Sequence, residues 1–264
     1  MSSDDDMQAV AEVARIAGNE ALGHYGKNVS IETKGDGSPV TIADRGAEEL
    51  ARRWIESRFP SDGIVGEEFG VIRPDARRRW IIDPIDGTKS FVRTVPLWGT
   101  LVAIAEGDTV VAGAAYFPAI GEIAVAAVGA GCWWNDSRCS VSTISDISAA
   151  TVLTSDLQFK AAPERQQVWN DLSDSAAVSR TWGDCYGYLL VATGRAEVMA
   201  DPIVSAWDVA ALMPLITEAG GAFTSWDGKE TAFGGSAIAT NGALSREVRD
   251  ILTGGRDNEA RLPR

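Results

Sequence analysis

Two aspartates three positions apart give the densest chemical signal in this chain of 264 residues. Asp83 and Asp86 lie in the segment 83–88, which reads DPIDGT and directly follows the apolar run 80–82. The proline and the glycine predict a tight turn after a buried strand, and such a turn aims both carboxylates at one point. Hard divalent cations take several oxygen ligands from a rigid frame, so both aspartates are candidate metal ligands. An ordinary Asx turn explains the same residues without a metal.

Three further acids stand at the ends of predicted elements. Glu67 follows the short apolar run 63–65, while Asp44 and Asp208 each stand at the start of a predicted helix. A solvated loop accounts equally well for Glu67, and helix capping for Asp44 and Asp208. At the predicted turn, the backbone N–H groups of Gly87 and Thr88 are placed to face phosphate oxygens.

Composition limits the partners of this chain. It has 24 basic and 37 acidic residues, a net charge of −13, which opposes binding to nucleic acid. If so acidic a protein handles a phosphorylated metabolite, a divalent metal is the economical bridge between its carboxylates and the phosphate. No apolar stretch predicts a membrane anchor, and the acidic N-terminus lacks a secretory signal, so we expect a cytoplasmic protein. Three irregularly spaced cysteines predict reduced thiols, with neither a disulfide framework nor a zinc site.

Hydrophobic periodicity predicts an α/β (α+β) chain with two halves, residues 1–148 and 149–264. In the first half we expect helices over 7–25 and 44–58, then strands of one largely antiparallel sheet at 63–66, 80–82, 100–105, 110–117 and 122–128. In the second half strands and helices mix more evenly: strands at 151–154, 197–200 and 222–225, and helices at 164–172, 186–193 and 209–219.

Four segments together resemble the inositol monophosphatase-like family of Mg²⁺-dependent, lithium-sensitive phosphatases. They are 34–44, 66–68, 83–88 and 207–208, the last followed by 217–221. Their order along the chain and their residue types match those of the family. The resemblance implies a layered α/β/α/β/α sandwich of two intimately packed subdomains, and a homodimer. It places most metal ligands in 1–148, and Asp208 with the substrate pocket in 149–264.

The same resemblance assigns roles to single residues. Glu67, Asp83 and the carbonyl of Ile85 would hold a first metal, and Asp83, Asp86 and Asp208 a second. The metal would be Mg²⁺, with Mn²⁺ as a possible substitute. Glu67, with Asp44 and Thr88 as a hydrogen-bonded pair, would orient the attacking water. The phosphate would lie against the following residues: Asp86, Gly87, Thr88 and Asp208.

Within the family, segments 86–93 and 95–101 most resemble the bacterial histidinol-phosphate phosphatases. Asp184 stands where inositol phosphatases typically carry a small neutral residue. The ammonium and imidazole of L-histidinol phosphate suit Asp184 and Asp201 as partners. An exposed loop acid explains Asp184 equally well, and Trp98 within 95–101 is explained equally by the core. One alternative is a monophosphatase that acts on inositol 1-phosphate or on a broad range of sugar and nucleotide phosphates, including fructose bisphosphate. The other is a non-catalytic scaffold that binds metal or phosphate.

Overall fold

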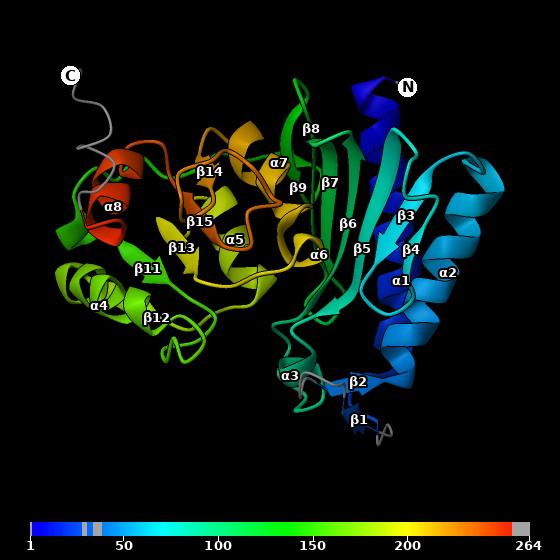
Figure 1. The fold of residues 1–264 in the computed structure, drawn as a ribbon, viewed down its shortest axis with the longest axis horizontal. Helices are drawn as coiled ribbons and strands as arrows, with labels where there is room; N and C mark the ends of the chain where they lie inside the picture. Colours follow the sequence, from blue (N-terminus) through cyan, green and yellow to red (C-terminus); the bar gives the residue numbers. More distant parts are fainter. Residues whose placement is uncertain (1, 28–30, 34–38, 255–264) are drawn as a thin grey trace.

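Five layers build the computed structural model, which describes residues 2–27, 31–33 and 39–254 (Figure 1). Helices α1 (Ser3–His24) and α2 (Ile42–Arg58) cover the outer face of an eight-stranded sheet, and α5 (Cys185–Ala192) and α7 (Leu212–Glu218) lie between this sheet and a five-stranded one. The outer face of the second sheet carries α4 (Gln166–Ser175) and α8 (Ser245–Leu252). This order confirms the predicted α/β/α/β/α sandwich. Part of the first family segment, 34–38, lies outside the described residues.

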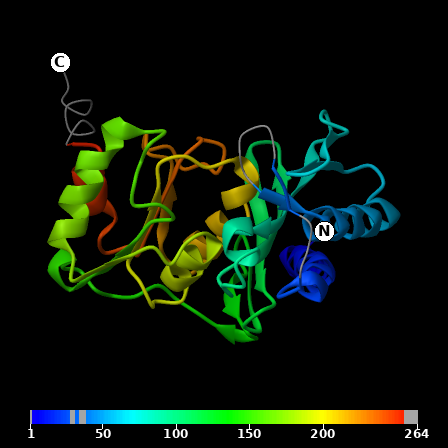
Figure 2. The same ribbon diagram turned by 90° about the horizontal axis from the view of Figure 1, so that it is seen from below.

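The large sheet confirms the expected antiparallel arrangement with one exception. Its strand order is β10-β9-β8-β7-β6-β5-β3-β4, and only β3 and β5 run parallel. The strands are β3 (Gly63–Gly66), β4 (Gly70–Ile72), β5 (Arg78–Asp86), β6 (Gly99–Glu106), β7 (Thr109–Phe117), β8 (Glu122–Ala127), β9 (Gly131–Trp134) and β10 (Ser137–Arg138). Beside the start of α2 lies a separate hairpin of β1 (Ile31–Thr33) and β2 (Pro39–Thr41), seen from below in Figure 2.

The second sheet has the order β12-β11-β13-β15-β14 and mixes parallel with antiparallel pairs. Its strands are β11 (Thr151–Leu153), β12 (Val178–Arg180), β13 (Val198–Asp201), β14 (Ala222–Thr224) and β15 (Ala237–Thr240). Two 3₁₀ turns, η1 (Ile147–Ala149) and η2 (Pro163–Arg165), precede β11 and α4. The chain changes sheets between β10 and β11, beside the predicted subdomain boundary at 148.

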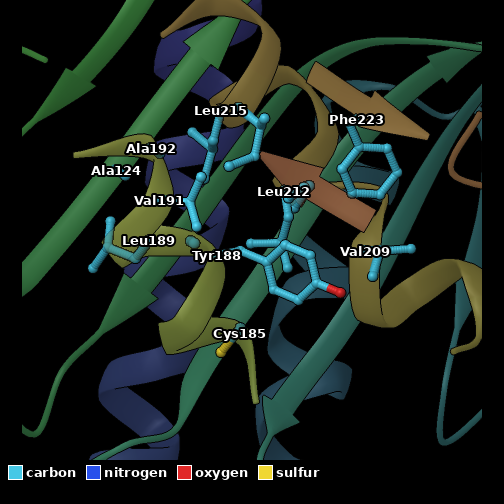
Figure 3. Close-up of a cluster of buried hydrophobic side chains, with 14 of the residues drawn as sticks. Ala124, Cys185, Tyr188, Leu189, Val191, Ala192, Val209, Leu212, Leu215 and Phe223 are labelled. Carbon is cyan, nitrogen blue, oxygen red and sulfur yellow. The ribbon is translucent and has the colours of Figure 1, made fainter. Parts of the chain in front are cut away.

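Three apolar cores lie between the helices and the sheets. The outer two lie under α1 and α2 on one side, and under α4 and α8 on the other. The central core joins both sheets. Figure 3 shows side chains of α5 and α7 in this core, among them Leu189, Val191, Leu212 and Leu215, together with Phe223 of β14. Because this core draws residues from both sheets, the two halves share one buried interior.

Two helices of the structure differ from the sequence expectation. The predicted helix 209–219 is divided into α6 (Ala206–Val209) and α7, and Pro214 explains the break because it offers no N–H to the preceding turn. In α2 the apolar stripe carries Ala47, Ala51 and Ile55 as expected. Arg52, which helical periodicity predicts outside this stripe, is nevertheless only 9% exposed and lies beside the fully buried Glu48.

Candidate metal and phosphate site

Asp83 and Asp86 come from the end of β5, and the tight turn predicted over this segment is confirmed at Gly87 but not at Pro84. The strand continues to Asp86, with a register shift between Asp83, which pairs with Leu101, and Asp86, which pairs with Gly99. In a regular strand, residues three apart point to opposite faces, so the irregularity is what allows both carboxylates to converge. The turn comes one residue later, at Gly87 with a φ of +84°, and leads into α3 (Thr88–Phe91).

Glu67 reaches the same edge of the sheet from the neighbouring strand. β3 runs parallel to β5 with Gly66 opposite Ile82, and the Glu67 N–H donates to the Ile82 carbonyl at 3.2 Å. Its side chain is half-buried, and burial together with the charge of its carboxylate raises the pKa of the neighbouring Asp83. The parallel pairing therefore places Glu67 beside the aspartates of β5.

The remaining two acids, Asp44 and Asp208, lie in the first turns of two helices and are held by the same capping interaction. Asp44 and Asp208 each lie at the third position of a helix and close a capping box. One oxygen of Asp44 accepts from the N–H and hydroxyl of Thr41, at 2.8 and 2.7 Å, and one oxygen of Asp208 accepts from the Ser205 N–H at 2.7 Å. Ser205, rather than Asp208, is therefore the N-cap residue of α6. Each cap fixes its carboxyl group and leaves that group a second oxygen.

The second oxygen of Asp44 lies near Thr88, the predicted partner. The Thr88 hydroxyl is 3.4 Å from Asp44 Oδ1 and 3.0 Å from the carbonyl oxygen of Ile85. The single hydroxyl proton can serve one of these acceptors at a time. The structure thus links Asp44, Thr88 and Ile85 in one short chain of polar contacts.

The acids of β5 and α6 converge on one point. Asp83, Asp86 and Asp208 each place a carboxylate oxygen within 4.8 Å of the others. They line a hollow of about 230 Å³ whose other lining residues are Glu67, Ile85, Gly87, Thr88, Lys89 and Asp184. All predicted metal ligands and phosphate-facing residues therefore share one hollow.

Burial and mutual repulsion raise the pKa values of these acids. Burial raises the pKa of Asp83 well above its usual range, and the charges of Glu67, Asp86 and Asp208 raise it further. Burial likewise raises the pKa of Asp86, and it raises the pKa of Asp208 to about 7. Charged carboxylates this close repel one another, and a cation bound among them would offset that repulsion. An all-oxygen donor set of this kind fits a hard divalent cation such as Mg²⁺ or Mn²⁺.

A second hollow of about 280 Å³ adjoins the first and shares Asp86, Asp184 and Asp208 with it. Its remaining wall mixes acids with aromatic and aliphatic side chains, including Asp156, Phe159, Tyr188, Asp201 and Ile203. Lys160 also lies on this wall. The hollow can therefore receive the organic part of an ester whose phosphate lies among the clustered carboxylates.

The sequence predicts that Asp184 and Asp201 bind the substrate, and both line this second hollow. They differ in burial and in their contacts with other residues. Asp184 is half-buried rather than an exposed loop acid; burial raises its pKa, and the charge of Lys89 counteracts that rise. The sequence interpretation missed Lys89, although it belongs to the quoted segment 86–93. Trp98 is fully buried and stacks edge-on against Phe91, as a core residue does.

Asp201 is 4% exposed, and protein donors already bind its carboxylate. The N–H and hydroxyl of Ser155 donate at 2.9 and 3.1 Å, Tyr188 donates at 2.9 Å, and Thr154 at 3.4 Å. Burial nevertheless raises its pKa to about 6. The structure therefore ties Asp201 into the wall of the second hollow.

Comparisons with known proteins agree with this site. The sequence matches the Inositol monophosphatase family over residues 3–253. It is 41% identical over 255 residues to a histidinol-phosphatase of Chlorobaculum parvum, covering 96% of this chain and 98% of that one, and 40% identical over 260 residues to a histidinol-phosphatase of Mycobacterium tuberculosis, covering 97% and 100%. The structure superposes on the extragenic suppressor protein SuhB of Bartonella henselae with a TM-score of 0.88 at 27% identity, covering 94% and 98%.

The fold and the acid-lined hollow, with these relatives, define a phosphatase. The chain belongs to the inositol monophosphatase family. Within the described ranges, no helix has the length and apolar character needed to cross a membrane.

Proposed function

We propose that this phosphatase hydrolyses L-histidinol phosphate to L-histidinol and phosphate with Mg²⁺ as cofactor. The observation that supports it best is the second hollow, which adjoins the carboxylate cluster and is lined by Asp156, Asp184 and Asp201. A neutral polyol such as inositol can only donate hydroxyl hydrogen bonds to so acidic a wall, whereas the ammonium of histidinol can also form an ion pair with it. The names of the relatives at 40–41% identity support the same substrate.

The residues proposed to hold the metals are Glu67, Asp83, Asp86, Asp208 and the carbonyl of Ile85. Bound Mg²⁺ would neutralise phosphate oxygens and make an adjacent water more acidic. Asp83 and Asp86 are unfavourable as buried charges. Because a cation would relieve this unfavourable energy, their burial would strengthen metal binding. The N–H groups of Gly87 and Thr88 at the start of α3 add donors for the phosphate.

The chain itself orients the attacking water. Glu67 stands at the rim of the cluster, and its carboxylate is the acceptor proposed to take a proton from water. With the Ile85 carbonyl on the metal, the Thr88 hydroxyl is proposed to donate to Asp44, which Thr41 holds. The Thr88 oxygen is then free to accept a hydrogen bond from the same water. Two fixed acceptors thus define the direction of attack on phosphorus.

At the other end of the ester, Asp184 is proposed to bind the cationic group of histidinol. Lys89 already compensates part of the Asp184 charge, so the substrate cation would share this carboxylate with a residue of the chain. The homodimer implied by the family resemblance, and the cytoplasmic location expected from the sequence, are part of the same proposal.

Replacing Asp184 tests the substrate assignment. Loss of one charge-assisted hydrogen bond costs about 1.5–3 kcal/mol, so Asp184→Asn should lower kcat/KM for histidinol phosphate by about tenfold to a hundredfold. Turnover of p-nitrophenyl phosphate, which lacks a cation, should change less than about threefold. Asp174→Asn, an exposed acid on α4, is the matched control. Equal losses on both esters would show that Asp184 supports the cluster instead of the substrate.

A further inference from the structure

We propose that Glu48 and Arg52 of α2 are positioning residues that hold the turn carrying Glu67, and so set the metal affinity of the cluster. This inference rests on the proposed role of Glu67 at the metal site. Neither residue lines the hollow, and both act through the backbone of residues 66–70, between β3 and β4.

The carboxylate of Glu48 binds the turn directly. One oxygen accepts from the Glu68 N–H at 2.7 Å, and the other accepts from the Phe69 N–H at 3.2 Å. Glu48 is fully buried, so these two amides have a charged acceptor shielded from water. The two amides follow Glu67 immediately, so the acceptor fixes the point at which the Glu67 side chain leaves the sheet.

Arg52 completes the arrangement one helical turn later. Its Nε donates to Glu48 Oε1 at 2.7 Å, and its Nη2 donates to the Gly70 carbonyl at 2.5 Å. The guanidinium therefore compensates the buried charge of Glu48 and also binds the far end of the turn. A buried pair of this kind is costly to break, because the remaining partner is left charged and unpaired.

Gly66 shows how closely this pair approaches the strand. A Cβ atom at this position would lie 2.0 Å from Glu48 Oε1 and 2.7 Å from Arg52 Nη2. Only glycine lets the pair rest against the backbone directly before Glu67. The strand end, the helix and the turn thus form one rigid support.

The neighbouring pair on the same helix provides a natural control. Glu49 and Arg53 have the same i, i+4 spacing as Glu48 and Arg52. Arg53 Nη2 lies 2.5 Å from Glu49 Oε1, but the side chains of Glu49 and Arg53 are 57% and 63% exposed. An exposed pair adds little to stability. If Glu48 acts by holding the turn, Glu48→Gln should have effects that Glu49→Gln lacks.

The first measurement is amide hydrogen exchange in metal-free protein. We expect Glu48→Gln to accelerate exchange at residues 67–70 by at least tenfold, with exchange in the central core unchanged. Glu49→Gln should match wild type throughout. Acceleration spread over the whole chain would overturn the proposal, because it would indicate a general loss of stability.

The second measurement is calorimetric titration of metal-free protein with Mn²⁺. Residues that orient a metal ligand typically change affinity by about 10–100-fold, and we expect a loss in this range for Glu48→Gln. In a Glu67→Gln background the same substitution should have little further effect, because Glu48 acts through Glu67. Arg52→Lys is the milder variant if Glu48→Gln fails to fold, with a smaller loss in the same direction expected.

The outcomes separate this inference from the proposed function. Wild-type protein that binds no Mn²⁺ would refute the metal site and this inference with it. Wild-type affinity in both Glu48→Gln and Arg52→Lys would overturn the inference alone. An undiminished effect of Glu48→Gln in the Glu67→Gln background would also overturn it, because Glu48 would then act by another route.

Discussion

Replacing Asp201 by asparagine should make the stability of this protein less sensitive to pH. Burial raises the Asp201 pKa from 3.8 to about 6. A raised pKa in the folded state means that the native protein binds the proton more tightly than the unfolded chain does. The contribution of Asp201 is therefore fully present below pH 3.8 and is lost as the pH rises towards and through 6.

The size of the effect follows from the two pKa values. Each tenfold change in acidity is worth about 1.4 kcal/mol, so ionising Asp201 in the folded protein costs about 3 kcal/mol at pH 7. Asparagine keeps an oxygen for the Ser155 N–H, and its amide can donate to the Tyr188 hydroxyl, which is free to reverse its role. The free energy of unfolding of Asp201→Asn, relative to wild type, should therefore increase by about 2.4 kcal/mol between pH 4 and pH 7, since part of the wild-type contribution is already lost at pH 4.

Urea unfolding followed by tryptophan fluorescence, in metal-free buffer at several pH values, measures this difference. Asp174→Asn, on the exposed face of α4, should show no pH-dependent difference from wild type. A constant difference for Asp201→Asn across the range, or one that shrinks as the pH rises, would refute the reasoning. The same variant tests the predicted substrate contact: a greater loss of kcat/KM for histidinol phosphate than for p-nitrophenyl phosphate would support it.

Two predictions concern the carboxylate cluster. EDTA should abolish phosphatase activity and Mg²⁺ should restore it, with a rise in Tm on metal addition; full activity in chelator would exclude the metal mechanism. Asp83→Asn should lower kcat/KM by more than about a hundredfold, because Asp83 is proposed to contact both metals. In metal-free buffer the same variant should be at least as stable as wild type by urea unfolding, since it removes a buried charge repelled by Glu67, Asp86 and Asp208. Substantial turnover by this variant would remove Asp83 from the mechanism.

The sequence indicated the acids of the cluster because each belongs to a short local pattern. Asp83 and Asp86 follow an apolar strand, and Asp44 and Asp208 stand at helix starts, where capping preferences are readable from the chain. The convergence of these segments could not be derived from periodicity. It depends on the parallel pairing of β3 with β5 and on the register shift in β5, which long-range packing decides.

The residues that sequence reasoning missed act across elements. Glu48 falls on the buried stripe of α2, and a carboxylate at an apolar position was the one available signal. Its partners, the amides of the turn after β3, lie about twenty positions away in the chain. Lys89 was visible in the segment 86–93, but its closeness to Asp184 arises only when the two sheets pack together.

The strands β12 and β15, which are only three and four residues long, were not predicted from the sequence. Their place in the second sheet comes from pairing with β11, β13 and β14. Local propensity is too weak to define such short strands, so the order of this sheet could not be predicted.

The second hollow is proposed to recognise a cationic alcohol. Steady-state kinetics of the Mg²⁺-loaded wild-type protein, with L-histidinol phosphate and inositol 1-phosphate assayed side by side, tests this claim most directly. We predict a kcat/KM at least tenfold higher for histidinol phosphate, and a smaller advantage at high ionic strength, where the charge contacts are screened. Equal or faster turnover of inositol 1-phosphate would contradict the claim.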